Sequence, residues 1–470
     1  MPSIAIAWFR RDLRLHDHPA LTAAIEAADV VIPVFVFDDA LLGGRTASAN
    51  RAWFMRESVV DLSRALAARG AALRVARGRP EDVLPALARE IGADRVYVTR
   101  DAAPYGRRRD RAAAARLDAE GVRLVELPGL YVHEPDEVTT RDGRGFSVYG
   151  PFRRAWEARD RRPMLPAPDR LPSRPGRPRR PDPVPELAQP TADRGLMPRP
   201  GEAAARDRLD GWLQRGLDGY AQTRNRLGDE DGTSRLSQDL RWGLLSPLEV
   251  VERAGVGSEG IRVFVAEVAW REFYANVLWH HPRILREQFR EPRSGPGFTS
   301  DPTTFDAWAT GRTGYPVVDA AMRQLRASGF VHNRARMIAA SFLAKDLLLD
   351  YRLGEAEFMR HLIDGDVASN NGGWQWTAGT GTDAQPFFRI FNPVLQGRRF
   401  DPDGVYVRRW VPELAGVPAA RIHDPWTMTS GEQAAARVRI GVDYPAPIVD
   451  HADARVRALA AYAAAAARPG

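Results

Sequence analysis

The stretch that decides how this chain is interpreted reads Asp364-Gly365-Asp366-Val367-Ala368-Ser369-Asn370-Asn371-Gly372-Gly373-Trp374-Gln375-Trp376. Carboxylates, amides, glycines and two indoles alternate within it. A hydrophobic core does not tolerate this polarity, and a solvated loop has little use for two tryptophans. The mixture suits a pocket that hydrogen-bonds a planar polar ring system and places aromatic faces beside it.

Helical patterns surround this stretch. Apolar residues recur at three- and four-residue spacing in residues 264–278, 317–325 and 334–349, and residues 454–467 are rich in alanine. Glycine and proline separate these segments, as in Gly314-Tyr315-Pro316. The sequence therefore predicts an all-α domain over residues 201–470.

The first 130 residues follow a different pattern. Short β-branched runs at residues 4–9, 30–37, 73–76, 95–99 and 122–127 alternate with alanine-rich helical stretches. This alternation predicts a doubly wound parallel sheet, an α/β domain of the Rossmann-like kind. The first turn after a strand is Arg10-Arg11-Asp12-Leu13-Arg14, so a glycine-rich NAD fingerprint is absent.

A proline-rich connection separates the two patterns. Residues 163–200 hold 12 of the 36 prolines in the chain, together with many arginines. Such a composition excludes helix and sheet interiors and predicts an extended segment over the surface. We expect three parts: residues 1–130, a linker over residues 131–200, and residues 201–470.

Composition limits the possible functions. The 470 residues contain no cysteine, which excludes disulfides, zinc thiolate sites and cysteine-ligated iron–sulfur clusters. The net charge is +7, and Lys345 is the only lysine among 67 basic residues, a bias typical of a GC-rich genome. No secretory signal or long apolar run is present, and we expect a soluble cytoplasmic protein.

Three further motifs carry polar chemistry. The run Gly232-Thr233-Ser234-Arg235-Leu236-Ser237 suits either a diphosphate cradle or a helix N-cap. Glu267, Trp270 and Arg271 share one face of an otherwise apolar helix and suggest a lined cavity. Asp364 and Asp366 lack the further carboxylates of a calcium loop, so we expect no metal there.

Matches in order along the chain make it resemble the photolyase/cryptochrome family, specifically class I cyclobutane pyrimidine dimer photolyases. Besides the opening stretch, the matching motifs are Trp8-Phe9-Arg10-Arg11-Asp12-Leu13-Arg14-Leu15-His16-Asp17, Tyr149-Gly150-Pro151-Phe152, Thr233-Ser234-Arg235-Leu236-Ser237, Glu267-x-x-Trp270-Arg271-Glu272-Phe273-Tyr274, Thr313-Gly314-Tyr315-Pro316, Thr380-Gly381-Thr382-Asp383, Arg389-Ile390-Phe391-Asn392-Pro393 and Pro445-x-Pro447-Ile448-Val449.

The resemblance implies FAD, held without a covalent bond in a U-shape. The implied phosphate-binding residues are Tyr220, Thr233, Ser234, Arg235, Leu236 and Ser237, with Arg271 nearby. Beside the isoalloxazine, Arg336 is implied to pair with Asp364, Asp366 to accept a hydrogen bond from the ring edge, and Asn370 to face N5. An amide at N5 adapts to a reduced flavin, whereas a carboxylate would repel it.

The implied activity is light-driven repair of UV-damaged DNA, in which a pyrimidine dimer is flipped out of the duplex. Trp270 and Trp376 are implied to wall the flipped bases, and Met337 to pack against them. Glu267 and Asn333 are implied to hydrogen-bond the pyrimidine edges. Arg224, Arg334 and Arg389 are implied to hold phosphates.

Two positions depart from the family pattern. The family relays electrons to the flavin through three tryptophans, and only the inner one is present here, as Trp374. The middle position holds Tyr351 and the outer one Phe298. Because tyrosine must lose a proton with its electron, we expect slow or rerouted photoreduction and unaffected repair by pre-reduced enzyme.

The segment Asp101-Ala102-Ala103-Pro104-Tyr105-Gly106-Arg107 resembles the deazaflavin-binding members. Asp101, with Arg51 and Arg241, is therefore implied to bind 8-hydroxy-5-deazaflavin as the antenna. Methenyltetrahydrofolate, or no antenna, is the alternative.

Three other interpretations of the function compete with this one. A cryptochrome-type blue-light receptor shares the fold and FAD, a (6-4) photolyase uses a histidine pair, and an electron-transfer flavoprotein needs no DNA. Met337 and the single His332 in its helix argue against the second, and the lesion-pocket residues argue against the third. We expect a monomer that acts on DNA and not on membranes.

Overall fold

The computed structural model describes residues 2–173, 180–290, 296–383 and 389–467. Five parallel strands form one sheet in the order β3-β2-β1-β4-β5. They are β1 (Ile4–Phe9), β2 (Val30–Asp38), β3 (Arg74–Gly78), β4 (Arg95–Thr99) and β5 (Arg123–Leu127). The doubly wound parallel sheet predicted from the sequence is confirmed, to within two residues at every strand end.

Helices cover both faces of this sheet. Helix α1 (Pro19–Ala27) contacts β1 and β4 on one face, and α4 (Pro80–Ile91) packs against α5 (Pro104–Asp118) on the other. Alternate side chains of β1 serve the two faces: Trp8 joins the cluster with α4 and α5, and Phe9 joins the other. This alternation follows from the two-residue period of a strand. The short helix α2 (Asp39–Leu42) follows β2.

The proline-rich connection crosses the surface, as its composition predicts. It follows helix α6 (Tyr149–Glu157), and between residues 163 and 193 its described residues contain neither helix nor strand. Asn50, in helix α3 (Ala49–Ala67), accepts hydrogen bonds from the backbone N–H groups of Thr191 (2.8 Å) and Ala192 (3.0 Å). A 3₁₀ turn, Arg194–Leu196, precedes the helical half. The domain boundaries themselves stay a prediction.

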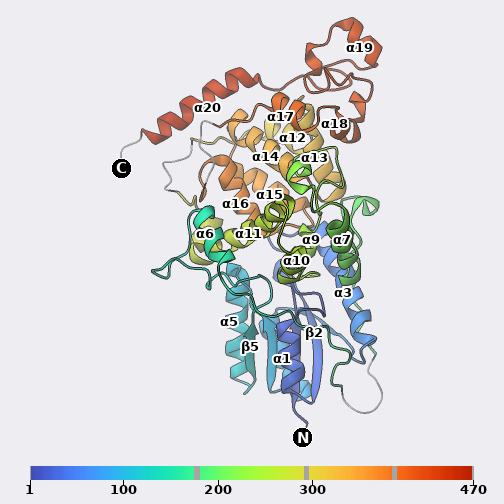
Figure 1. Cartoon of the computed structure of the whole chain (residues 1–470), viewed down its shortest axis with the longest axis vertical. Coiled ribbons are helices and arrows are strands. Elements are labelled where there is room, and N and C mark those ends of the chain that lie inside the picture. The colour runs from blue at the N-terminus through green and yellow to red at the C-terminus, as the bar shows by residue number, and fades with distance from the viewer. Residues whose placement is uncertain (1, 174–179, 291–295, 384–388, 468–470) are drawn as a thin grey trace.

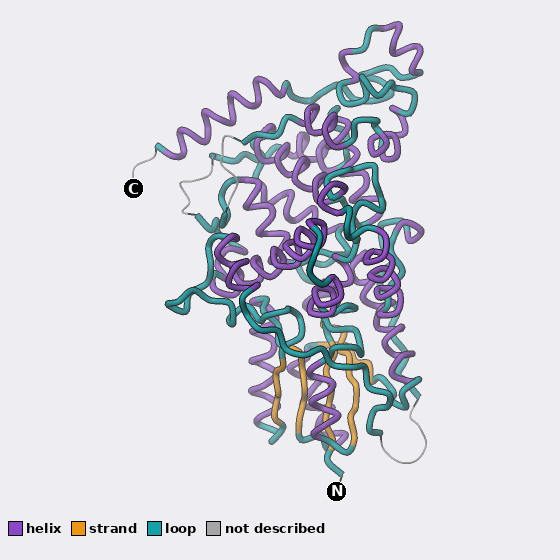
Figure 2. The backbone as a smooth tube through the Cα atoms, viewed as in Figure 1, coloured by secondary structure: helices purple, strands orange, loops and turns teal. Residues whose placement is uncertain are grey.

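The second half consists of helices joined by loops, and its described residues contain no strand apart from isolated bridges (Figure 2). Its helices are α7 (Glu202–Arg215), α8 (Tyr220–Thr223), α9 (Ser237–Trp242), α10 (Pro247–Ala254), α11 (Glu259–His280), α12 (Pro302–Ala309), α13 (Pro316–Ser328), α14 (Asn333–Ser341), α15 (Tyr351–His361), α16 (Val367–Ala378), α17 (Pro393–Phe400), α18 (Val405–Trp410), α19 (Ser430–Ala436) and α20 (His451–Ala466). None of the described helices is long and apolar enough to cross a membrane.

The helical pattern over residues 334–349 predicts one regular α-helix, but the structure shows a change of helix type within it. Helix α14 ends at Ser341 and continues as a π-helical turn, Phe342–Asp346. The turn is closed by a hydrogen bond from the N–H of Leu347 to the carbonyl of Phe342, over 3.0 Å. A π-turn carries one extra residue per turn, which shifts the side chains after it to another face.

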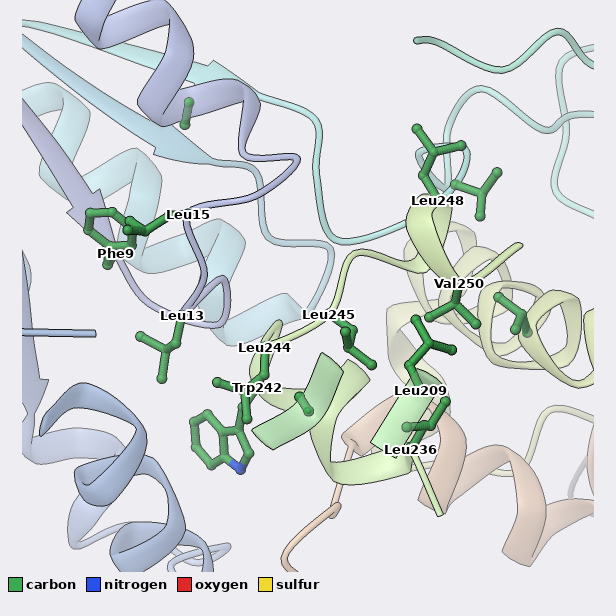
Figure 3. Close-up of a cluster of buried hydrophobic side chains, with 14 of the residues drawn as sticks. Phe9, Leu13, Leu15, Leu209, Leu236, Trp242, Leu244, Leu245, Leu248 and Val250 are labelled. Carbon is green, nitrogen blue, oxygen red and sulfur yellow. The ribbon is translucent and has the colours of Figure 1, made fainter. Parts of the chain in front are cut away.

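The two halves of the chain share one core. In Figure 1 the sheet lies at the lower end of the molecule, below the helical part. Figure 3 shows Phe9, Leu13 and Leu15, from β1 and its following loop, near Trp242 and Leu244 of the helical half. The sheet's carboxyl edge is therefore buried against the helical domain and is in the usual position for a ligand site of an open α/β sheet.

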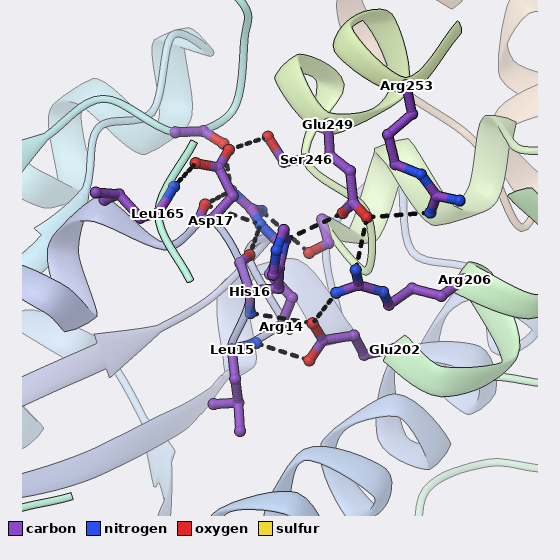
Figure 4. Close-up of polar contacts among 12 residues, drawn as sticks. Arg14, Leu15, His16, Asp17, Leu165, Glu202, Arg206, Ser246, Glu249 and Arg253 are labelled. Atoms are coloured by element: carbon purple, nitrogen blue, oxygen red, sulfur yellow. Dashed lines mark hydrogen bonds and ion pairs between the residues drawn. The ribbon is translucent and has the colours of Figure 1, made fainter. Parts of the chain in front are cut away.

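Polar contacts fix this interface as well (Figure 4). The carboxylate of Glu202 accepts hydrogen bonds from the backbone N–H groups of Leu15 (2.7 Å) and His16 (3.0 Å). Buried Glu249 lies 2.9 Å from Arg206 Nη2 and 3.4 Å from His16 Nδ1. These contacts hold the loop after β1 against α7 and α10.

Candidate functional site

Helix α16 begins at the sheet–helix interface. Asp366 is its N-cap and accepts hydrogen bonds from the N–H groups of Ala368 (3.0 Å) and Ser369 (3.1 Å). Its other oxygen accepts from Arg11 Nη2 over 2.7 Å. Burial opposes ionisation of this carboxyl, but the guanidiniums of Arg11, Arg241 and Arg271 hold the pKa of Asp366 well below its usual range.

Asp364 lies just before this helix and pairs with Arg336 of α14, Oδ2 to Nη2, over 2.7 Å. The carboxylate is buried, and its Oδ1 has no hydrogen-bond partner among the described residues. A buried carboxylate oxygen without a donor is rare in a finished fold. It therefore marks a position where a ligand N–H or O–H group would bind.

Asn370 follows Asp366 by one helical turn, so the two side chains share a face of α16. The Asn370 amide donates to the carbonyl of Glu355 over 3.0 Å, and the neighbouring Asn371 amide donates to the Glu355 carboxylate over 3.1 Å. Burial raises the pKa of Glu355 to about 7. Asn370 remains half-buried, with its position fixed by α15.

The candidate diphosphate cradle precedes α9. This helix starts at Ser237, its N-cap residue is Leu236, and no side chain caps it. The capping interpretation of the Thr-Ser run is therefore wrong. Arg235 has a left-handed backbone, with φ 49°. The first N–H groups of α9 lack a side-chain cap, which suits an anion. Tyr220 lies in a buried aromatic group, with its ring 5.8 Å from that of Phe264.

A pocket adjoins this cradle. It is lined by Leu227, Gly228, Asp229, Glu230, Thr233, Arg235, Gln324, Phe330, His332, Val405, Tyr406, Arg409 and Trp410. His332 is the N-cap of α14: its Nδ1 accepts from the N–H of Arg334 over 3.1 Å, while Nε2 is buried without a described partner. Burial, together with nearby arginines such as Arg334 and Arg336, lowers the pKa of His332 to about 4. The imidazole is therefore neutral near pH 7.

The second group of predicted residues lies on α11. Glu267 pairs with Arg224, Oε1 to Nη2, over 2.6 Å. Burial raises the pKa of Glu267, and Arg224 opposes that shift. The Trp270 ring stacks on Tyr149 at 3.7 Å between centroids and 10° between planes. Arg271 points instead to the domain interface, where Nη1 donates to the carbonyl of Leu130 over 3.0 Å.

Helix α14 faces the same region. Asn333 and Met337 are one turn apart and in contact, with Nδ2 4.0 Å from Sδ. Arg334 donates to the side-chain oxygen of Asn225 over 2.8 Å. Arg389 is exposed, and Trp376 is half-buried. Helix α16 contacts both α11 and α14, so the two predicted groups lie on neighbouring elements.

The predicted electron relay is only partly continuous. Trp374 is buried, and its ring contacts Phe358 (5.0 Å) and Trp308 (6.0 Å). The Tyr351 ring contacts Phe298 instead, at 5.8 Å. The Tyr351 hydroxyl has no hydrogen-bond partner in the described residues, and burial raises its pKa to about 12. The polar side chains close to this hydroxyl are the Thr380 hydroxyl and the Glu355 carboxylate.

The three predicted antenna residues converge at the carboxyl edge of the sheet. Arg51 donates to the carbonyl of Leu362 over 2.9 Å, and Arg241 Nε to that of Gly365 over 2.8 Å. Asp101 lies 3.6 Å from Arg11. Burial and the neighbouring Arg11 lower the pKa of Arg241 to about 9, and its Nη1 has no described partner. This region holds a buried excess of positive charge.

Both halves of the chain match known families. Residues 5–172 match the family model "DNA photolyase", and residues 264–464 match "FAD binding domain of DNA photolyase". A curated relative from Agrobacterium fabrum, named deoxyribodipyrimidine photo-lyase, is 41% identical over 98% of this chain and 97% of its own length. The chain belongs to the DNA photolyase family.

Solved structures agree with this membership. A bacterial class III photolyase from Agrobacterium tumefaciens is 39% identical, covers 100% of this chain and 98% of its own, and superposes with a TM-score of 0.93. A cryptochrome from Synechocystis is 31% identical, with 98% and 99% coverage and a TM-score of 0.88. The α/β antenna-type domain followed by a helical FAD domain is thus the architecture of this photolyase-family chain.

Several residues of this photolyase-family site had no role predicted from the sequence. Arg11 pairs with Asp366, Tyr149 covers one face of Trp270, and Glu355 holds Asn370. A charged residue directly after β1 in a doubly wound sheet is a usable signal for Arg11. Tyr149 lies in one of the motifs that match the family, whereas nothing local distinguishes Glu355.

The alternative of a metal at Asp364 and Asp366 gains no support. In the part of the chain that the structure describes, no three His, Asp or Glu side chains are grouped to hold a metal ion. The two carboxylates pair with Arg336 and Arg11 instead.

Proposed function

We propose that this chain is a light-driven deoxyribodipyrimidine photolyase of class I that binds FAD and splits cyclobutane pyrimidine dimers. The observation that carries the proposal is the packing of two residue groups on touching helices. The Asp364–Arg336 pair and Asn370 form the first group, and Glu267 with Asn333 the second. A ring-binding group and a base-edge group on neighbouring helices are what electron transfer between two bound rings requires.

The residues fit FAD at two points. Asp364 Oδ1 is a buried acceptor without a donor, which suits an N–H at the edge of the isoalloxazine. Asp366, which was expected to accept from the ring edge, keeps that proposed role, because each carboxylate oxygen can accept a second hydrogen bond, and Asp364 Oδ1 is a further acceptor. The uncapped start of α9 would hold the phosphates, together with Tyr220 of α8. When bound and reduced, FAD supplies an electron after absorbing blue light.

The lesion side has its own fixed geometry. Glu267 and Asn333 would hydrogen-bond the pyrimidine edges, and Met337 would pack beside them. Trp270, whose orientation is set by Tyr149, would wall the flipped bases together with Trp376. Glu267 is held in place by Arg224, which favours its ionised form. These groups act by position and by charge on the dimer.

DNA binding would come from three arginines that the structure leaves near the surface. Arg224, Arg334 and Arg389 would contact phosphates on either side of the flipped dimer. The planar guanidinium of Arg334 is set by Asn225 and lies 4.6 Å from the ring of Phe400. Such contacts position the strand without reading its sequence.

The antenna proposal rests on charge. A buried excess of guanidiniums, with Arg241 Nη1 lacking a partner in the described chain, suits an anionic chromophore. We propose 8-hydroxy-5-deazaflavin at Arg51, Asp101 and Arg241, with methenyltetrahydrofolate or no antenna as alternatives. An Arg241→Met variant is expected to lose bound deazaflavin, read from the absorption spectrum, while FAD content stays unchanged.

A blue-light receptor is the second candidate, because a cryptochrome shares this fold. One experiment separates the two: blue-light repair of UV-irradiated oligothymidylate by anaerobic, dithionite-reduced enzyme. Recovery of thymine absorbance in light but not in darkness supports the photolyase. Glu267→Ala should lower that recovery while FAD content is retained, and Glu267→Gln should lower it less. No recovery by a protein that retains reduced FAD would favour the receptor.

A further inference from the structure

Lys345 stands out against the composition of the chain. It is the only lysine among 67 basic residues, so arginine occupies every other basic position. The side chain is fully buried, at 0% exposure. The chain uses arginine at every other basic position, and this buried position is the one exception. A specific requirement for an ammonium group at this position explains the exception.

The contacts of Lys345 define that requirement. The residue lies in the π-helical turn after α14, and its Nζ donates to the backbone carbonyl of Arg389 over 2.8 Å. Burial lowers its pKa to about 8, with Asp346 opposing the shift. Asp346 is itself buried and bonds to His451 at the start of α20. The ammonium thus links the π-turn to the segment that leads into α17.

An arginine would not replace this lysine. An ammonium is compact and directs its donors tetrahedrally, whereas a guanidinium is wide and planar. The π-turn widens the helix and places the Lys345 stem among fully buried neighbours, including Leu343 and Ala344. A wider head group in this close-packed region would have to displace the Arg389 backbone. The geometry therefore explains why this position alone kept lysine.

We propose that Lys345 is a positioning residue for DNA binding: by holding the Arg389 carbonyl it fixes where the Arg389 guanidinium meets a phosphate of the damaged strand. The inference rests on the proposed function, which gives Arg389 its phosphate. A second hydrogen bond supports it, because the N–H of Phe391 donates to Ser341 Oγ over 3.4 Å. The end of α14 and its π-turn thus anchor the segment at two points.

The test measures, in darkness, the affinity of the protein for an oligonucleotide duplex that contains one thymine dimer. The measurement is repeated over a range of salt concentrations. Lys345→Met should weaken binding by about tenfold and lower the salt slope by about one, because one phosphate contact is lost. Lys345→Arg should weaken it equally despite keeping the charge. Lys345→Gln should recover part of the affinity, since its amide can donate to the carbonyl. Arg123→Met, which changes an exposed residue at the start of β5, controls for the loss of one charge.

A double-mutant cycle decides the assignment. In an Arg389→Ala background, Lys345→Met should add no further loss of affinity. An equal loss in both backgrounds, or full affinity in Lys345→Arg, would overturn the proposal. FAD content and the melting temperature, measured for each variant, show whether folding accounts for a loss. If Lys345→Met does not fold, the comparison of Lys345→Gln with Lys345→Arg decides. Light-driven repair by the unmodified enzyme tests the proposed function separately.

Discussion

Arg11 and Asp366 meet across the domain interface: the Arg11 guanidinium, in the loop after β1, donates to the carboxylate at the start of α16 over 2.7 Å. The two residues are 355 positions apart in the sequence. Asp366 also caps α16, the helix that carries Asn370 and Trp374. One guanidinium therefore ties the carboxyl edge of the sheet to the helix proposed to face the flavin.

Removing this pair should destabilise the whole protein. Arg11→Met leaves the largely buried Asp366 carboxylate with fewer cations and should lower the free energy of unfolding by about 3 kcal/mol at pH 7. Arg153→Met, which breaks an exposed pair with Glu157, should cost about 0.5 kcal/mol. Urea titration followed by tryptophan fluorescence measures both. Equal costs in the two variants would contradict an interface role for Arg11.

Asn50 should control how firmly the proline-rich connection is held. Its oxygen accepts from Thr191 and Ala192, and its amide donates to the carbonyl of His361 over 2.7 Å. Asn50→Ala removes these hydrogen bonds, two of which are buried, at a cost of about 2 kcal/mol. Limited proteolysis should then cut residues 163–200 faster than in Gln189→Ala, an exposed change in the same segment. Unchanged cleavage would show that other contacts suffice.

Photoreduction should be limited by Tyr351 and Phe298. A buried tyrosine with a pKa of about 12 gives up an electron poorly because it must lose its proton as well, and a phenylalanine ring is still harder to oxidise. Tyr351→Trp combined with Phe298→Trp should speed light-driven flavin reduction by about tenfold or more, a barrier change of about 1.4 kcal/mol. The flavin absorption spectrum under blue light measures the rate.

Repair by pre-reduced enzyme is the control for this pair, and it should be the same in all variants. Wild-type photoreduction as fast as that of the double variant would contradict the argument. Normal photoreduction in Tyr351→Phe would remove Tyr351 from the relay.

Acid stability should depend on His332. Its pKa is depressed to about 4 in the folded protein, against about 6.5 when unfolded, so the unfolded chain binds the extra proton between these values. Its contribution is therefore complete above pH 6.5 and is lost as the pH falls through 4. Between pH 7 and 5 the loss is about 2 kcal/mol.

His332→Asn keeps an N-cap and removes the titration. The stability of this variant, measured with saturating FAD, should fall less between pH 7 and 5 than that of wild type, by that amount. Parallel pH curves for the two proteins would show that another group is responsible.

The positions of the strands and of most helices were predictable because their signals are local. The β-branched runs at residues 4–9 and 95–99 and the apolar spacing of residues 317–325 report periods of two and 3.6 directly. The π-turn after α14 was missed, since the apolar pattern continues through it while the backbone gains one residue. The capping interpretation of the Thr-Ser run before α9 was wrong for a similar reason. Threonine and serine favour N-caps, but the backbone takes a left-handed conformation at Arg235 and the helix starts only at Ser237.

The sequence by itself determined the two-domain architecture, the family resemblance and the residue types available for flavin, dimer and phosphate. Only the tertiary structure decided which of them meet. It paired Arg11 with Asp366 and Glu267 with Arg224. It also left Asp364 Oδ1 buried without a described donor, and it brought Lys345 Nζ to the backbone carbonyl of Arg389. The physical reason is that periodicity and capping act over a few residues, whereas these contacts join positions that only packing brings together.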